Sequence, residues 1–170
     1  MDQRAQIIRA PSRPAITGKV AVFLAGTTTG TTAAAAAAGA DWRETVTLAV
    51  SHLPVTVLNP LRPDWDGSWR EDPSFAPFRE QIEWELDMQE RADLVVVYLG
   101  PGTDAPVSLL ELGLCARSGK AVVVACYPGY RKRGNVQIVC RWFGLEYVDG
   151  EDDLAGRVVK RIERLLELGN

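Results

Sequence analysis

The sequence predicts an α/β protein built on a doubly wound parallel sheet, and three observations support this class. Apolar runs rich in β-branched residues recur along the chain, for example at residues 94–99 and 121–125. Such runs are typical of strands that are buried on both faces. Segments with the apolar spacing of helices lie between them. Strands that alternate with helices form parallel sheets with right-handed crossovers.

The elements follow from these patterns in order. The predicted strands are residues 19–25, 54–58, 93–100, 120–127 and 145–148. The predicted helices run from near the alanine tract 33–38 to about residue 53, then over 75–91, 108–118, 135–143 and 151–168. Residues 61–77 form a long loop with two tryptophans, Trp65 and Trp69, which suits either a lid over a site or a loop anchored by packing.

This order predicts one domain at residues 19–170, preceded by an N-terminal arm at residues 1–18. The expected architecture is a five-stranded, flavodoxin-like (Rossmann-like) three-layer sandwich, with helices on both faces of the sheet. Residues 6–9 are a possible edge strand, which would make the sheet six-stranded.

Composition excludes several classes of function. The 170 residues carry a net charge of −3 and no large basic block, which disfavours nucleic-acid binding and leaves free nucleosides or nucleotides as possible ligands. No stretch reaches the ~18 apolar residues of a membrane span, and the N-terminus does not resemble a signal peptide. The three cysteines lie in apolar contexts and are expected to be reduced, so we expect a cytoplasmic protein.

The segment from residue 93 to residue 113 is the most informative for function. A buried strand leads through a Gly- and Pro-rich turn into a helix expected to start at Ser108, which puts Glu111 in the first helical turn. The positive field of a helix N-terminus favours an ionised carboxylate, which could act as a nucleophile. Ser108-x-x-Glu111 is also a capping box, in which the glutamate would only bind a backbone N–H.

The predicted site gathers residues from the carboxyl ends of the first three predicted strands. Gly26 and Thr27 follow the first strand and Asn59 the second; Gly102 lies in the turn before Glu111, and Glu85 can reach the site from the preceding helix. Two converging carboxylates suit glycosyl chemistry, in which one attacks an anomeric carbon and the other assists. Metal binding is the alternative use of such a pair.

The sequence lacks the motifs and residues that several other common chemistries require. There is no G-x-x-x-x-G-K-[ST] motif and no G-x-G-x-x-G motif, so ATPase and dinucleotide-dependent functions are disfavoured. His52 is the only histidine, which disfavours a serine–histidine triad and a histidine metal site. We therefore expect no cofactor and no bound metal.

Several short motifs together resemble the nucleoside 2-deoxyribosyltransferase-like proteins. They are Phe-Leu-Ala-Gly at 23–26, Asn-Pro-Leu-Arg at 59–62, Gln-Ile-Glu-Trp-Glu at 81–85, Ala-Asp at 92–93, and Leu-Glu-Leu-Gly at 110–113 with Gly-Lys at 119–120. The resemblance implies that Glu111 attacks C1′ of a 2′-deoxynucleoside, expels the base and holds the sugar as an ester. It also implies that Glu85 helps to hold the nucleoside and that Asn135 reaches the site of a neighbouring subunit, which requires at least a homodimer.

The chain departs from the family pattern at two positions. Val22 stands where a tyrosine on the first strand orients the nucleophile. Ala105 stands where an acidic residue usually handles the proton of the base, and the adjacent Asp104 could substitute for it.

Three functions follow from the resemblance and the site. The first is an N-glycosyl transferase that passes the sugar of a (deoxy)nucleoside to another free base through a glycosyl–Glu111 intermediate. The second is a hydrolase of the N-glycosidic bond of nucleosides or nucleoside monophosphates, whose phosphate the hydroxyls of residues 27–32 could bind. The third is a non-catalytic nucleotide-binding module, which the loss of the tyrosine at Val22 favours.

Overall fold

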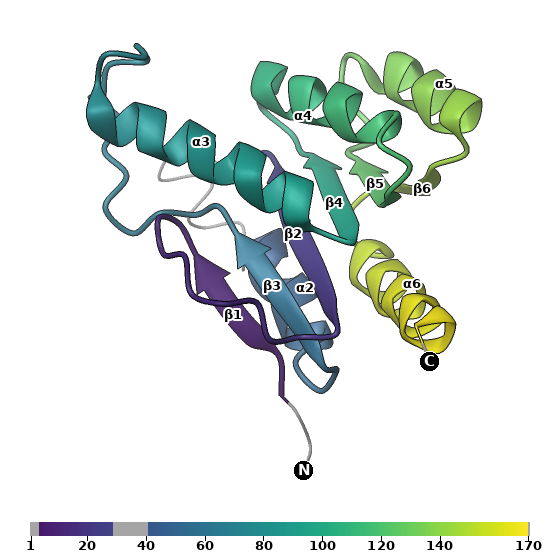
Figure 1. Ribbon diagram of the computed structural model, residues 1–170. Coiled ribbons are helices and arrows are strands. Elements are labelled where there is room, and N and C mark those ends of the chain that lie inside the picture. The colour runs from purple at the N-terminus through teal and green to yellow at the C-terminus, as the bar shows by residue number, and fades with distance from the viewer. Residues whose placement is uncertain (1–3, 29–40, 170) are drawn as a thin grey trace.

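Six parallel strands form the sheet, in the order β1-β3-β2-β4-β5-β6 (Figure 1). The computed structural model describes residues 4–28 and 41–169. The strands are β1 (Gln6–Arg9), β2 (Val20–Gly26), β3 (Val55–Asn59), β4 (Leu94–Leu99), β5 (Ala121–Cys126) and β6 (Glu146–Asp149). Strand order reverses between β2 and β4, so the carboxyl ends of these two strands mark the crevice in which doubly wound sheets bind ligands.

Helices cover both faces of the sheet, as predicted (Figure 1). They are α2 (Trp42–Ala49), α3 (Ala76–Arg91), α4 (Pro106–Ala116), α5 (Arg133–Phe143) and α6 (Leu154–Leu168). Buried side chains of α3, α4 and α5 share one apolar core with alternate residues of the strands. Those of α2 and α6 share the other, because successive residues of a strand point to opposite faces.

The sheet has six strands, so the expectation of five was wrong and the edge strand forms. β1 pairs with β3 in parallel register, with Ile7 opposite Val57. Only Ile8 of β1 is fully buried, which is why so short a strand gives a weak sequence signal. The side chain of Gln6 fixes the arm by hydrogen bonds to Thr17 and Thr56.

Helix α4 begins two residues earlier than predicted, and the capping box does not form. Its N-cap is Ala105, in the left-handed conformation with φ of 47°, and it has no side-chain cap. Pro106 occupies the first helical position, where the missing N–H of proline costs no hydrogen bond. Glu111 is therefore beyond the first turn, and its carboxylate does not cap the helix.

The remaining elements match the predictions to within a few residues. The predicted helix around the alanine tract is present as α2, which the side chain of Asp41 caps, whereas residues 33–38 lie outside the described part of the chain. The three cysteines are buried and form no disulfide. No helix in the described residues is long and apolar enough to span a bilayer.

Candidate functional site

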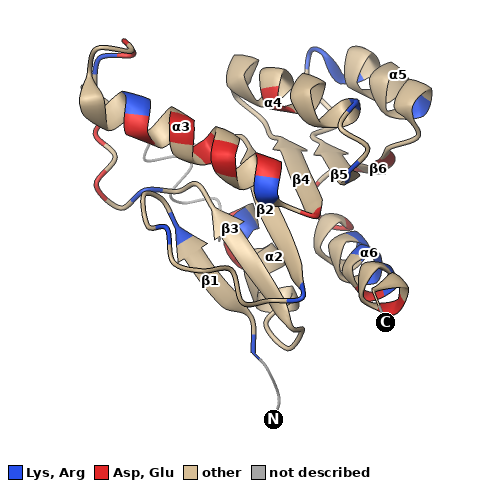
Figure 2. Cartoon of the chain, in the orientation of Figure 1, with Lys and Arg blue, Asp and Glu red and all other residues tan. Residues whose placement is uncertain are grey.

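Two carboxylates from separate helices come together beside the end of β2. Glu85 lies on α3 and Glu111 on α4, and both side chains are half-buried. Glu111 is the only charged residue of α4, visible as the isolated acidic position on that helix in Figure 2. A lone carboxylate on an otherwise apolar helix that packs on the core carries a desolvation cost. The packing of the helix does not require this charge.

The carboxylates are electrostatically coupled. Burial, and after it the nearby charge of Glu85, raise the pKa of Glu111 to about 7, against opposing effects of Arg43 and of a hydrogen bond from Gly26. Burial also raises the pKa of Glu85, against the hydrogen bond from Gln81 and the charge of Arg43. The expected stabilisation of an ionised Glu111 by its helix N-terminus is thus wrong, because desolvation outweighs any helix dipole effect beyond the first turn.

Gly26 brings one backbone donor to this pair. Its φ of 123° is a conformation that favours glycine, and a Cβ at this position would lie 2.3 Å from the carbonyl oxygen of Tyr98. In this conformation the N–H of Gly26 donates to the carboxylate of Glu111. This position is compatible with the predicted role of Gly26 at the site, where its N–H contacts Glu111, the candidate nucleophile.

Arg43 is a buried cation at the same place. Its side chain is 1% exposed, and among the described residues it is the only Lys, Arg, Asp or Glu that is buried. Three of its N–H groups donate to the carbonyls of Leu24, Gly26 and Thr27, at 3.2, 2.8 and 3.0 Å. Desolvation lowers its pKa to about 10, so it stays charged at neutral pH, and its charge interacts with Asp41, Glu111 and Glu85.

Two glutamines of α3, Gln81 and Gln89, hold the residues of the carboxylate pair in place. Nε2 of Gln81 donates to the carbonyl of Pro60 and to Oε1 of Glu85, both at 2.8 Å. Nε2 of Gln89 donates to the backbone carbonyl of Glu111 at 3.2 Å, which ties α3 to α4. Both glutamines are buried, so the two carboxylates are held on a fixed frame.

Thr27 and Asn59 lie at the predicted sheet edge, but their polar groups are engaged within the fold. The hydroxyl of Thr27 accepts from the N–H of Gly100 at 3.0 Å, which joins the turns after β2 and β4. Oδ1 of Asn59 accepts from the N–H of Leu61 at 2.9 Å and shapes the turn after β3. Both residues are buried, and they shape the walls of the site.

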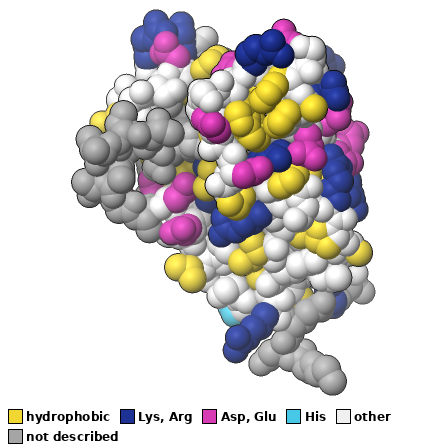
Figure 3. Space-filling view, turned by 90° about the vertical axis from the view of Figure 1, so that its left-hand side faces the viewer, with side chains coloured by type: hydrophobic (Ala, Val, Ile, Leu, Met, Phe, Trp, Pro, Cys, Tyr) yellow, Lys and Arg dark blue, Asp and Glu magenta, His cyan; other side chains and the backbone are white. Residues whose placement is uncertain are grey.

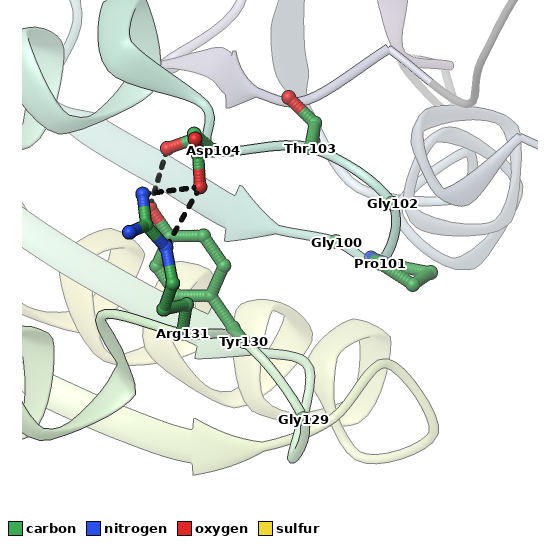
Figure 4. Close-up of a pocket in the computed structure, with 8 residues that line it drawn as sticks. All are labelled: Gly100, Pro101, Gly102, Thr103, Asp104, Gly129, Tyr130 and Arg131. Atoms are coloured by element: carbon green, nitrogen blue, oxygen red, sulfur yellow. Dashed lines mark hydrogen bonds and ion pairs between the residues drawn. The ribbon is translucent and has the colours of Figure 1, made fainter.

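Gly102 and Asp104 belong to a neighbouring cavity of about 310 Å³ between the loops after β4 and β5 (Figure 4). Its lining includes Gly100, Gly102, Asp104, Tyr130 and Arg131. The side chains of Asp104 and Arg131 point toward each other in Figure 4 and form an exposed ion pair at 2.9 Å. Neither is among the groups that shift the pKa of Glu85 or Glu111.

Asn135 lies apart from the carboxylate pair, exposed in the first turn of α5. Ile138 and Trp142 follow it at helical spacing and are 56% and 81% exposed. Residues three, four and seven apart share a helix face, so Asn135 shares its face with two unpartnered apolar side chains.

The loop between β3 and α3 packs largely on itself. Trp69 contacts Trp65 and Phe75, with ring centroids 5.0 and 6.0 Å apart, and the guanidinium of Arg62 lies over Trp69. Arg62 also binds Glu80 at the start of α3. These contacts of Trp69 and Arg62 favour an anchored loop.

Hydrophobic and charged side chains lie side by side on the face of the molecule shown in Figure 3.

Sequence reasoning missed Arg43, Gln81 and Gln89. A signal for Arg43 was available, because it lies next to Trp42 in a helix whose apolar positions, 42, 46 and 50, face the core. An arginine beside such a stripe, preceded by an aspartate, is a candidate for a buried charge. Gln81 lies in the motif at residues 81–85, four residues before Glu85, a spacing at which helical side chains meet, whereas Gln89 gave no comparable signal. No group of three His, Cys, Asp or Glu side chains within the described ranges is arranged to hold a metal ion.

Comparison with known proteins identifies the family. The nucleoside 2-deoxyribosyltransferase like family matches residues 19–130, which is more than half of the chain. The chain belongs to this family. The resemblance stated from the sequence motifs is thereby confirmed, and Arg43, Glu85 and Glu111 all lie within the matched region of this nucleoside 2-deoxyribosyltransferase-like protein. None of the curated proteins matches the chain.

Proposed function

We propose that this chain cleaves the N-glycosidic bond of a (deoxy)nucleoside through a covalent glycosyl–Glu111 intermediate and transfers the sugar to another base. One observation carries the proposal: two half-buried carboxylates with raised pKa values converge beside a buried arginine at the crevice of the sheet. Ionisable groups with pKa values shifted in this way concentrate at catalytic sites. Family membership supplies the nucleoside as the substrate class.

Burial raises the pKa of both carboxylates and the two repel each other, so the pair can share a single proton. The reactive form has that proton on Glu85 and leaves the carboxylate of Glu111 free to attack. In the first half-reaction an oxygen of the Glu111 carboxylate attacks C1′, and an ester bond forms as the bond between C1′ and the base nitrogen breaks. The electron pair of that bond goes to the base, which takes the proton from Glu85. Free base and glycosyl–enzyme result.

The second half-reaction reverses these steps with a new acceptor. The Glu85 carboxylate takes a proton from the incoming base, whose nitrogen attacks C1′. The ester bond to Glu111 breaks and the carboxylate is restored. Water in place of the base gives hydrolysis, so exclusion of water decides between transfer and hydrolysis.

The proposal includes a homodimer formed through the helices α4 and α5. Leu110 and Leu114 on α4 are 64% and 51% exposed, and Trp142 on α5 is 81% exposed. Exposed apolar surface of this kind marks an interaction site. Burial of this surface against a second copy places Asn135 in the interface, and Trp142→Glu is expected to convert the dimer to a monomer in analytical ultracentrifugation. Sedimentation of the unchanged chain as a monomer would contradict this part of the proposal.

Intact-mass analysis after mixing with deoxyadenosine tests the reaction directly. A protein species heavier by one deoxyribosyl group is expected, and Glu111→Gln should abolish it. Asp104→Asn, which alters an exposed carboxylate of the neighbouring cavity, is the matched control and should keep the adduct.

Addition of free cytosine separates transfer from hydrolysis. Transfer predicts deoxycytidine, with adenine release that depends on the acceptor. Adenine release without dependence on cytosine, or release only from deoxyadenosine monophosphate, would indicate the hydrolase instead. Binding of the nucleoside with no adduct and no release of base would overturn the enzymatic proposal in favour of a binding module.

A further inference from the structure

Arg43 is buried where a charge is costly, which calls for an explanation beyond packing. Transfer of an unpaired ion from water into a protein interior costs roughly several kcal/mol. Buried charged groups therefore need partners that compensate for this cost. The nearest acid, Asp41, lies 3.9 Å away, and the closer partners of Arg43 are three main-chain carbonyls. Its charge is thus incompletely paired by its own neighbours.

The three carbonyls lie at the carboxyl end of β2, two within the strand and that of Thr27 just after it, beside the carboxylate pair. Arg43 donates to Gly26 O at 2.8 Å, and the N–H of the same Gly26 donates to Glu111. The glycine has a φ of 123°, and its conformation is fixed on one side by the backbone of Tyr98. Arg43 fixes it on the other side, so the direction of the N–H depends on the guanidinium.

No side chain of β2 can take over this role from position 22. Val22 is fully buried in the core formed with α2 and α6, whereas Glu111 lies on α4, on the opposite face of the sheet. A group that orients Glu111 must therefore act beyond the carboxyl end of β2, and Arg43 reaches that end from α2 through the carbonyls of Gly26 and Thr27.

We propose that Arg43 is the positioning residue of this site. Its hydrogen bonds hold the N–H of Gly26 toward Glu111, and its charge offsets the repulsion between Glu85 and Glu111. This inference rests on the proposed function of Glu111 as the nucleophile. Arg43 itself does not touch substrate.

The electrostatic part of the role involves a short list of groups. Glu85 and Arg43 are the charged groups that act on Glu111. Arg43 in turn faces Asp41 as well as the two glutamates. The thiol of Cys115 is close to Glu111, but burial raises its pKa to about 12, so it stays neutral in the range tested.

Two substitutions separate the charge of Arg43 from its hydrogen bonds. Arg43→Gln removes the charge, so the titration midpoint of the glutamate pair should rise by about one pH unit, the effect of losing a nearby opposite charge. Arg43→Lys keeps the charge but cannot form the planar fork, so the midpoint should stay near that of the unchanged protein. Formation of the glycosyl–enzyme should slow by about 100-fold in both variants, as expected for a misplaced reacting group.

The midpoint is measured by ¹³C NMR of protein labelled at the glutamate carboxyl carbon, with Glu111→Gln and Glu85→Gln for assignment. Trp42→Phe is the matched control, because its indole N–H donates to the carbonyl of Thr27, which Arg43 also binds, but carries no charge. It should leave the titration unchanged. An unchanged midpoint in Arg43→Gln, or the same shift in Trp42→Phe, would overturn the proposal. If Arg43→Gln does not fold, a normal rate in Arg43→Lys would overturn it as well.

The titration needs no substrate, so the two proposals fail in different ways. A raised midpoint in Arg43→Gln without any glycosyl–enzyme in the unchanged protein supports the placement of Arg43 and overturns the proposed reaction. If the glycosyl–enzyme forms, but neither its rate of formation nor the titration midpoint changes in the Arg43 variants, the reaction is supported and the positioning role is overturned.

Discussion

Two pairs of charged side chains lie near the carboxyl edge of the sheet, and they differ in nearly every physical respect. Glu85 and Glu111 are half-buried like charges with raised pKa values, held by buried glutamines and a buried arginine. Asp104 and Arg131 are opposite charges with side chains 65% and 68% exposed, joined by an ion pair of 2.9 Å. The first pair costs stability and the second is close to neutral, because exposed ion pairs contribute little.

The comparison separates residues kept for chemistry from residues that belong to an ordinary surface. A fold has no structural reason to bring two carboxylates together away from water, whereas an exposed ion pair between adjacent loops needs no special explanation. The buried pair should therefore control reaction rate and pH dependence, while the exposed pair should affect neither strongly.

The largest effect is expected from Glu85→Gln. Loss of the proton donor should slow base release by about 10²- to 10⁴-fold, the usual contribution of general acid catalysis. The alkaline decline of activity, which follows loss of the proton that the pair shares, should also disappear, because the variant has no acid at residue 85 to deprotonate. Rates of base release across pH 4.5 to 9 measure both.

Glu83→Gln is the matched control for this experiment. It removes an exposed carboxylate of the same helix, which lies 3.9 Å from Arg79 on the solvent side. Equal losses in the two variants would show that Glu85 acts through helix stability instead of proton transfer.

An effect of intermediate size is expected from Glu111→Gln on the free energy of unfolding. The pKa of Glu111 rises from its usual 4.5 to about 7 in the folded chain, so the native state binds more protons than the unfolded state between these values. Stability must then fall as pH rises through this window and is fully present only below it. Glu111→Gln should gain about 3 kcal/mol in free energy of unfolding relative to the unchanged protein as the pH rises from 4.5 to 8.

Urea unfolding at the two pH values measures this difference. A gap between Glu111→Gln and the unchanged protein that does not vary with pH would show that the carboxylate is solvated, and the contrast between the two charged pairs would be lost.

The smallest effect is expected from Asp104→Asn and Arg131→Gln. Each breaks the exposed ion pair and should change the free energy of unfolding by no more than about 0.5 kcal/mol, as usual for surface substitutions. Base release should stay close to that of the unchanged protein. A large loss of rate in Asp104→Asn alone would instead assign it the role of acid toward the base, which its position next to Ala105 suggested from the sequence.

Much of the fold could be predicted because it depends on local patterns. The strands at 94–99 and 121–126 are continuous apolar runs, and the helix at 76–91 carries its buried residues at helical spacing. The edge strand β1 was less certain, since it buries one residue and depends on pairing with β3, 50 residues away. The start of α4 was misplaced because Ala105 adopts a left-handed conformation that alanine rarely favours.

The sequence by itself determined the alternation of strands and helices, the family, and Glu85 and Glu111 as the candidate acids, because these depend on residue type and spacing along the chain. Tertiary structure alone decided that the two acids share a desolvated environment and that Arg43, 68 residues before Glu111, lies behind them. The physical reason is that a pKa depends on burial and on charges close in space. Distance along the chain carries no information about either.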